Sequence, residues 1–173
     1  MGLLACQWAN HLGVKVIGTV GSAAKAEIAR QHGCEHVIDY SRENFAMRVR
    51  QITVGNGVPV VYDGVGKATF DGSLDCLSPL GLMVSFGNAS GTPPPLDLGR
   101  LAMGGSLFIT RPTLMHYTSD PEDLAEGSAE MFELVRSGVI KVEVHQKYAL
   151  ADAAEAHRDL EARKTTGATV LVP

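Results

Sequence analysis

The sequence has no excess of basic residues and no run of lysine and arginine. It carries 15 basic and 19 acidic residues, which gives a formal net charge of −4 at neutral pH. Proteins that bind nucleic acid need a basic surface that neutralises phosphates. We therefore expect no nucleic-acid partner.

The sequence also lacks a long hydrophobic run. No uninterrupted apolar stretch reaches the roughly 18 residues that a membrane span requires. The apolar N-terminal stretch has no basic segment and no cleavage pattern, and Gln7, Asn10 and His11 interrupt it. We expect a cytoplasmic protein with no signal peptide and no membrane partner.

Cysteine is scarce, and two common catalytic motifs are absent. Cys6, Cys34 and Cys76 are far apart and show no C-x-x-C spacing, so neither a disulfide framework nor a thiolate zinc site is indicated. We expect three reduced and mostly buried thiols. H-E-x-x-H and G-x-S-x-G are also missing, and we expect no metal site and no serine-hydrolase chemistry.

Apolar strand patterns alternate with helical patterns along most of the chain. The strands are expected at 14–20, 36–39, 58–63, 82–87 and 106–110, with helices between them. Such alternation is typical of right-handed βαβ units that stack into a parallel sheet. The predicted fold class is therefore α/β, a Rossmann-type doubly wound parallel sheet.

The last part of the sequence has a different pattern. VIKVEVHQKYAL alternates like a half-exposed strand, ADAAEAHRDLEAR is amphipathic, and TGATVLVP reads as a short strand. We expect a nucleotide-binding domain over 1–138 and a strand, helix and strand over 139–173.

Ligands of such sheets bind outside the carboxyl ends of the strands. After the first strand, at 14–20, NAD-binding proteins place an acidic residue against the adenosine ribose. No Asp or Glu occurs from Val14 through Lys25, and the segment offers Gly21, Ser22 and Lys25 instead. These residues suit an additional 2′-phosphate, so NADP(H) is favoured over NAD as the cofactor.

Two further strand ends carry polar residues with a less specific meaning. Tyr40 is suited to stacking on adenine or to bonding a phosphate, but a tyrosine at a strand end is common without any ligand. Asp63 is followed by Gly64 and Gly66. We interpret Asp63 as a cap of the next helix rather than as a general base.

Several long segments together resemble one family. They are GLLACQWAN, GTVGSAAKAE, VVYDGVG, SLDCLSPLGLMVSFGNASG, GSLFITRPTL and SGVIKVEV. In this order they resemble the second half of the NADPH:quinone oxidoreductases, the zinc-independent, zeta-crystallin-like branch of the medium-chain dehydrogenase/reductase superfamily. The resemblance covers nearly the whole chain.

The resemblance implies a binding site for the phosphate end of the cofactor. Gly2 matches the final glycine of the family's pyrophosphate turn. Ser22, Lys25 and Tyr40 match its 2′-phosphate and adenosine contacts, and Arg163 matches a distant arginine that reaches the same phosphate.

The nicotinamide end is implied in the same way. Phe86, Gly87 and Asn88 match the walls around the nicotinamide, and the segment Thr110 to Pro112, with Arg111, matches a further wall. No residue of this sequence is identified as catalytic.

The function implied by the resemblance is electron transfer from NADPH to a quinone, by hydride or in one-electron steps, without zinc and in a homodimer. The alternative is a non-catalytic nucleotide-binding or oligomerisation domain, because the family's substrate cleft lies between two domains. Both hypotheses remain open at this point.

The sequence departs from the family at its start. The N-terminal catalytic domain and the first strand of the nucleotide fold have no counterpart, and Met1 stands where the family has valine. We expect a mis-assigned start or a truncated gene. In this reading, 1–138 is a truncated NADP-binding domain, and 139–173 is the part that packs with the catalytic domain in the family.

The missing strand is central in the strand order 3-2-1-4-5-6 of this fold. Its absence leaves two inner edges without a partner, which is costly for buried backbone groups. We predict that the two halves slide together or that a partner chain fills the gap.

Overall fold

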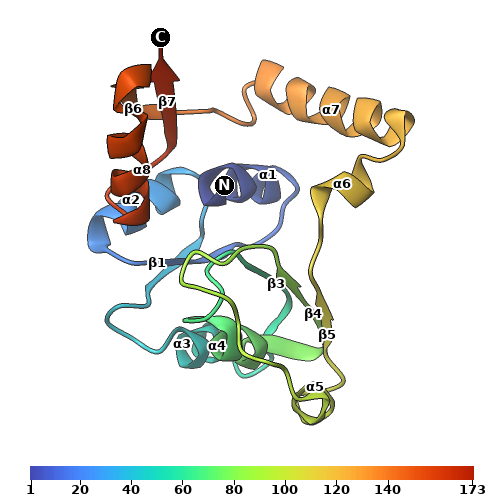
Figure 1. The fold of residues 1–173 in the computed structure, drawn as a ribbon. Coiled ribbons are helices and arrows are strands. Elements are labelled where there is room, and N and C mark those ends of the chain that lie inside the picture. The colour runs from blue at the N-terminus through green and yellow to red at the C-terminus, as the bar shows by residue number, and fades with distance from the viewer. The chain divides into compact units, whose positions relative to one another are not determined.

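A computed structural model describes residues 1–173. The chain forms two compact units: unit 1 consists of Met1–Ser41 and Gly127–Pro173, and unit 2 is Arg42–Glu126. Every strand pair is parallel, and helices connect the strands in sequence (Figure 1). The parallel α/β fold class predicted from the sequence is confirmed.

The N-terminal part of unit 1 is one βαβ element preceded by a helix. Its elements are α1 (Gly2–His11), β1 (Ile17–Val20), α2 (Ala23–Gln31) and β2 (His36–Asp39). β1 pairs with β2 from Ile17 opposite His36 to Val20 opposite Asp39. α2 packs on both strands and buries Ala26 and Ala29. Both strands therefore end at the same edge, where a ligand of this fold would bind.

The C-terminal part of unit 1 contains a second parallel pair. Its elements are β6 (Val144–Ala149), the 3₁₀ turn η1 (Leu150–Asp152), α8 (Ala153–Glu161) and β7 (Ala168–Val172), preceded by α7 (Pro121–Arg136). β6 pairs with β7, and α8 packs on β6. This is the strand, helix and strand that the sequence predicts after residue 138.

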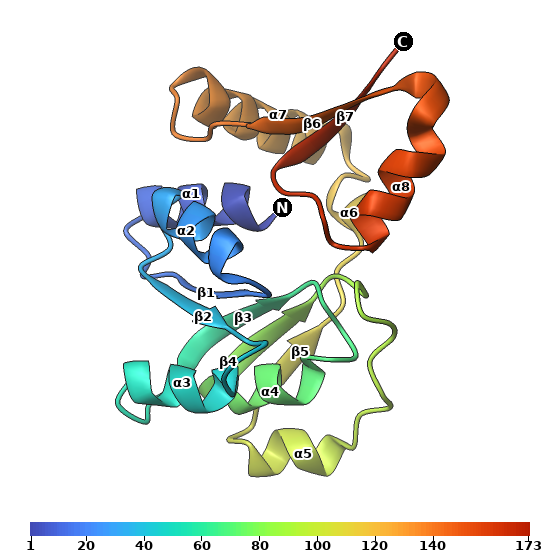
Figure 2. The same cartoon turned by 90° about the vertical axis from the view of Figure 1, so that its left-hand side faces the viewer.

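Unit 2 contains a three-stranded parallel sheet in the order β3-β4-β5. Its elements are α3 (Phe45–Ile52), β3 (Val58–Asp63), α4 (Phe70–Asp75), β4 (Leu77–Ser85), α5 (Leu98–Met103), β5 (Phe108–Thr110) and α6 (Leu114–Tyr117). α4 packs on β3 and β4, and α3 lies beside α4 (Figure 2).

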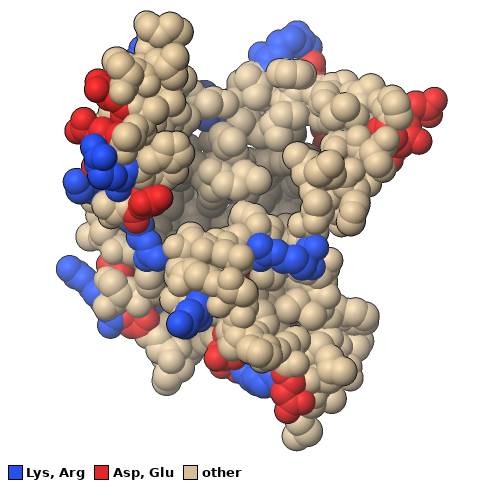
Figure 3. All heavy atoms as spheres, viewed as in Figure 1, with Lys and Arg blue, Asp and Glu red and all other residues tan.

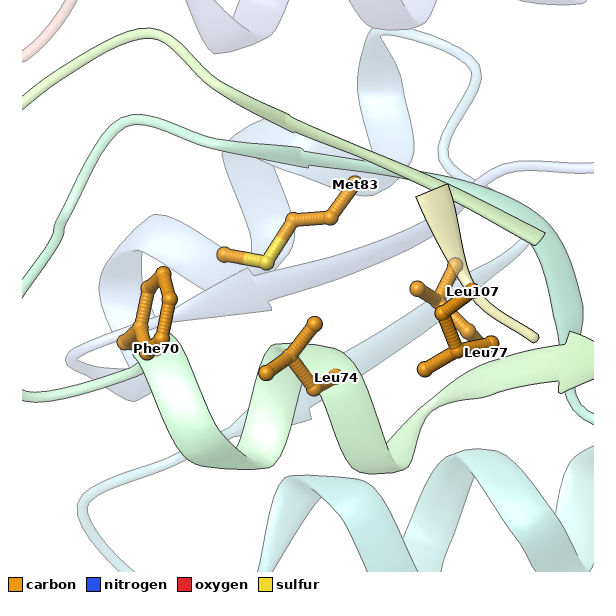
Figure 4. Close-up of a cluster of buried hydrophobic side chains, with 5 residues drawn as sticks. All are labelled: Phe70, Leu74, Leu77, Met83 and Leu107. Atoms are coloured by element: carbon orange, nitrogen blue, oxygen red, sulfur yellow. The ribbon is translucent and has the colours of Figure 1, made fainter. Parts of the chain in front are cut away.

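The core of unit 2 lies between α4 and the sheet. Phe70 and Leu74 extend from α4 toward Met83 of β4, and Leu77 and Leu107 complete the cluster (Figure 4). Leu77 and Met83 have no exposed surface. Burial of these side chains fixes α4 on the sheet and therefore fixes the loop between β3 and α4.

Some element bounds differ from the sequence prediction. β1 begins at Ile17 rather than at residue 14, and β4 begins at Leu77 rather than at 82. Helix α5 lies between the predicted strands at 82–87 and 106–110, and the side chain of Asp97 caps it by accepting a hydrogen bond from the Gly99 amide at 2.9 Å.

β1 and β3 each pair with one neighbouring strand, β2 and β4 respectively. These are the two edges that the sequence predicts to flank the missing central strand. Closure of the gap and its filling by a partner chain stay predictions, as does a domain boundary at residue 138.

None of the helices combines the length and the apolar composition that crossing a membrane requires.

Charged side chains are mixed on the face that Figure 3 shows. Lysine and arginine are scattered among acidic residues, and acidic side chains gather over α7, whose first turn contains Glu122 and Asp123. This position suits α7, since acidic residues stabilise a helix N-terminus.

We predict that the core of unit 2 depends strongly on Leu77. Leu77→Ala removes a fully buried side chain and should lower the free energy of unfolding by about 2 to 5 kcal/mol. The matched control is Leu98→Ala, because Leu98 is 75% exposed and should change stability by less than about 0.5 kcal/mol. Urea unfolding measures both, and equal losses would contradict the assigned core.

Candidate functional site

The first group of predicted site residues lies at the carboxyl ends of β1 and β2 in unit 1. Ser22 follows β1 and caps α2, since its Oγ accepts a hydrogen bond from the Lys25 amide at 3.4 Å. Tyr40 follows β2, and its amide donates to the Val20 carbonyl at 3.1 Å. The Tyr40 hydroxyl would lie 3.0 Å from a Cβ at Gly21. Glycine at residue 21 therefore gives the ring its place above the strand end.

A residue from the other end of the sequence joins this group. The Lys25 Nζ donates to the main-chain carbonyl of Arg163 at 2.8 Å, and the Arg163 Nη1 donates to the Tyr40 hydroxyl at 3.4 Å. An ammonium group has three donors, and this contact uses one of them. Two cationic side chains, a tyrosine hydroxyl and a capping serine thus meet at one strand edge.

Arg163 occupies a backbone conformation that favours glycine. Its φ is 58°, and it follows the last turn of α8. The Arg163 amide donates to the Leu160 carbonyl, and the Lys164 amide donates to the Asp159 carbonyl, both at 3.0 Å. This pair of bonds defines a Schellman motif, in which Arg163 holds the left-handed position that glycine usually takes. An arginine there costs backbone energy of about 1 kcal/mol.

Asp159 fixes the turn that carries Arg163. Its carboxylate accepts hydrogen bonds from the Tyr148 hydroxyl at 2.9 Å and from the Lys164 Nζ at 3.0 Å. The hydrogen bonds from Lys164 and then Tyr148 hold the pKa of the Asp159 carboxyl below its ordinary value. The turn is therefore tied to β6 on one side and to its own lysine on the other.

Gly2 starts α1, and open space surrounds the position where a Cβ would be. The helix has neither a side-chain cap at its N-terminus nor an acidic residue in its first turn. The first amides of such a helix end attract anions. This geometry is compatible with the predicted pyrophosphate contact at Gly2.

The second group of predicted site residues lies in unit 2 and is organised by Asp63 at the end of β3. One carboxylate oxygen accepts from the amides of Val65 and Gly66 at 2.8 and 3.0 Å. The other accepts from the hydroxyls of Thr69 and Ser73, each at 2.8 Å. Asp63 is 4% exposed and its acceptors face only these groups. Its role is to hold the loop after β3. The prediction that Asp63 caps the next helix is wrong, because the N-cap residue of α4 is Thr69.

The loop after β3 lies tightly against the loop after β4. The Phe86 amide donates to the Asp63 carbonyl at 2.9 Å. A Cβ at Gly64 would lie 2.8 Å from the Phe86 ring, and a Cβ at Gly87 would collide with the Gly64 carbonyl oxygen. Glycine at 64 and 87 is therefore required for this close approach.

Arg111 connects the end of β5 to the same loop. Its Nη1 donates to the Asn88 side-chain oxygen at 3.1 Å and to the Gly87 carbonyl at 3.3 Å. Phe86 keeps 41% of its surface exposed above these contacts. The structure thus brings Phe86, Gly87, Asn88 and Arg111 together at one edge of the unit 2 sheet.

The sequence prediction missed the residues that support the two groups. Asp159 and Tyr148 position Arg163, and Thr69 and Ser73 satisfy Asp63. Their sequence signal is weak, since an aspartate five residues before a lysine or a hydroxyl in a helix is common. The chain contains no group of three or more His, Cys, Asp or Glu side chains arranged to hold a metal ion.

A family model described as zinc-binding dehydrogenase matches residues 1–130. A quinone oxidoreductase from Pseudomonas aeruginosa is 56% identical over 173 residues, which is all of this chain and 53% of that protein. A 2-haloacrylate reductase from Burkholderia sp is 48% identical over a match that includes all of this chain and 52% of that protein.

A solved structure agrees with these relatives. The crystal structure of Escherichia coli quinone oxidoreductase complexed with NADPH matches with a TM-score of 0.96 at 52% identity, over 99% of this chain and 53% of that chain. The chain therefore spans about half the length of the curated relatives it matches.

Two glycine replacements should have opposite effects, because Gly87 lies where the two loops approach closely and Gly127 lies in an open helix position. Gly87→Ala forces Gly64 to move and should lower the free energy of unfolding by about 1 to 3 kcal/mol. Gly127→Ala lies inside α7 with nothing within 4 Å of the new methyl group. It should raise the free energy by about 0.5 to 1 kcal/mol. Thermal unfolding tests both, and a neutral Gly87→Ala would contradict the contact.

The Asp159 contacts predict a pH dependence of stability. Because the folded pKa of Asp159 lies below its ordinary value of 3.8, its contribution is present above that value and is lost as the pH falls through the folded pKa. Asp159→Asn should therefore unfold at a lower temperature than the wild type near neutral pH, and the gap should close in acid.

The matched control for this pH dependence is Asp152→Asn. Asp152 precedes α8, and its side chain makes no capping hydrogen bond. Its melting temperature should depart from that of the wild type by less than the melting temperature of Asp159→Asn does. A gap between Asp159→Asn and the wild type that stays constant into acid would refute the assigned role of the carboxylate.

Proposed function

The chain belongs to the zinc-binding dehydrogenase family and, within it, to the quinone oxidoreductases, and from this premise we propose that it is the NADPH-binding part of an NADPH:quinone oxidoreductase. When bound, NADPH supplies a hydride, and with a proton it reduces a quinone to a hydroquinone. The part of the reaction that this chain's residues perform is binding and orientation of the cofactor. The proposed activity needs no zinc.

The observation that carries this proposal is the convergence of Lys25, Arg163 and Tyr40 at the ends of β1 and β2. The cationic side chains of Lys25 and Arg163 lie beside one strand end, and no acidic residue occurs between Val14 and Lys25. This arrangement suits the 2′-phosphate of NADP(H) better than the free 2′-hydroxyl of NAD(H). Ser22 adds a hydroxyl at the N-terminus of α2. We assign this group to the 2′-phosphate of NADP(H).

The conformation of Arg163 supports the same assignment. A residue held in a strained backbone region is a reason to look for function. Glycine would satisfy the Schellman turn after α8 without strain, but it has no guanidinium group to direct toward Tyr40. The side chain of Arg163 therefore has a role that the turn itself does not need.

In unit 2 we assign the nicotinamide end to the loop after β4. Phe86 offers an exposed ring, and Gly87 allows the loop after β3 to lie directly against the loop after β4. Arg111 holds Asn88 in place through its 3.1 Å hydrogen bond. These residues orient the cofactor ring, and no residue of the chain is assigned a proton-transfer role.

The alternative is a non-catalytic nucleotide-binding or oligomerisation domain. It is supported by the roles of the polar groups described above, which bind or position, since none of them is assigned to proton transfer. A homodimer is proposed in either case, because β5 pairs on one side only, with β4, and Phe108 on it is 58% exposed.

Cofactor titration with NADPH and NADH tests the proposed phosphate site. Arg163→Gly should weaken NADPH binding about tenfold or more, which is a loss of roughly 1.4 kcal/mol, and leave NADH binding unchanged. The same variant should unfold at an equal or higher temperature than the wild type, since glycine relieves the left-handed backbone strain.

Lys25→Met should weaken NADPH binding in the same selective way. Its matched control is Lys15→Met, because Lys15 is an exposed lysine of the same unit that pairs only loosely with Glu35, at 3.8 Å. Equal losses of NADH and NADPH affinity would overturn the assignment. Saturable NADPH binding without quinone-dependent NADPH oxidation would favour the non-catalytic alternative.

A further inference from the structure

Two of the three cysteines lie together in unit 1, although they are 28 positions apart in the sequence. Cys6 is in α1, and Cys34 lies in the turn between α2 and β2. Their thiols lie close enough for each to shift the pKa of the other. Neither thiol belongs to the cofactor site proposed above.

The packing of α1 explains why the two thiols meet. Cys6 and Asn10 are four residues apart and therefore lie on the same face of α1. A Cβ at Gly33 would lie 2.8 Å from the Asn10 Cβ. The face of α1 that carries Cys6 is thus pressed against the turn that carries Cys34.

Gly18 of β1 provides the space for the Cys34 sulfur. A Cβ at Gly18 would lie 2.7 Å from the Cys34 Sγ. On its other sides the Cys34 thiol contacts the carbonyls of His36 at 3.1 Å and Val16 at 3.6 Å. Cys34 is buried and Cys6 is half-buried, so the solvent reaches the pair from the α1 side.

From this packing we propose that Cys6 and Cys34 form an oxidative modification site, at which a small peroxide such as hydrogen peroxide converts the two thiols into an intrachain disulfide. The pair has the arrangement that the reaction needs, with one reactive and one resolving sulfur in contact.

The surroundings give the two sulfurs different roles. The hydrogen bond from the Cys6 thiol, then the amides of Gly18 and His36 and the charge of Arg30, lower the pKa of Cys34 against the effect of burial. The pKa of Cys6 is raised by its bond to Cys34 and by burial. Cys34 is therefore the attacking sulfur and Cys6 the resolving one, since the thiolate is the nucleophile.

The reaction balances in two steps. The Cys34 sulfur attacks a peroxide oxygen, so that an S–O bond forms, the O–O bond breaks and the leaving hydroxide takes the thiol proton to become water. The Cys6 sulfur then attacks the Cys34 sulfur; the S–S bond forms, the S–O bond breaks, and the second water leaves with the Cys6 proton. Two thiols lose two electrons, and the peroxide gains them.

Thiol titration of the native protein after hydrogen peroxide treatment tests the proposal. The three free thiols should fall to one, peptide mapping should find a Cys6–Cys34 cross-link, and dithiothreitol should restore all three. Retention of three thiols, or a cross-link between two chains, would overturn it.

Single variants separate the two roles and guard against misfolding. Cys76→Ser should still lose two thiols, because Cys76 lies in unit 2 and burial raises its pKa to about 11. Cys6→Ser and Cys6→Ala should expose a sulfenic acid on Cys34 that dimedone traps, while the wild type gives little adduct. Equal dimedone labelling in wild type and both Cys6 variants would contradict a resolving role for Cys6.

Discussion

The hydrogen bond from the Lys25 ammonium group to the Arg163 carbonyl connects residues 138 positions apart. It helps to hold the end of α8 beside the ends of β1 and β2, where the Arg163 guanidinium reaches the Tyr40 hydroxyl. The strand ends alone supply Ser22, Lys25 and Tyr40. The proposed phosphate site therefore depends on a contact between the chain's two terminal segments.

The two groups of site residues are built by different physical means. In unit 1 polar and charged side chains make the site, and their positions are set by a helix cap and a strained turn. In unit 2 the backbone makes the site: a buried aspartate holds one loop, and two glycines allow a second loop to approach it. The proposed 2′-phosphate site therefore depends on charge, and the proposed nicotinamide site depends on the shape of the two loops.

The sequence allowed the fold class and most strands to be predicted, because β-branched runs such as 58–63 end at glycine and alternate with helical patterns. The positions of Ser22 and Tyr40 directly after strands also followed from local patterns. The support of Arg163 by Asp159 and the meeting of Cys6 with Cys34 did not, since both depend on packing between distant segments. Positive φ at Arg163 has no sequence signal, because arginine rarely adopts it.

The division into units has a consequence for synthesis of the chain. Unit 2 is one continuous stretch, Arg42–Glu126, whereas unit 1 needs both Met1–Ser41 and Gly127–Pro173. As translation proceeds, unit 2 holds all of its own contacts before the last 47 residues (127–173) emerge. The proposed phosphate site is thus the last part of the molecule to be assembled.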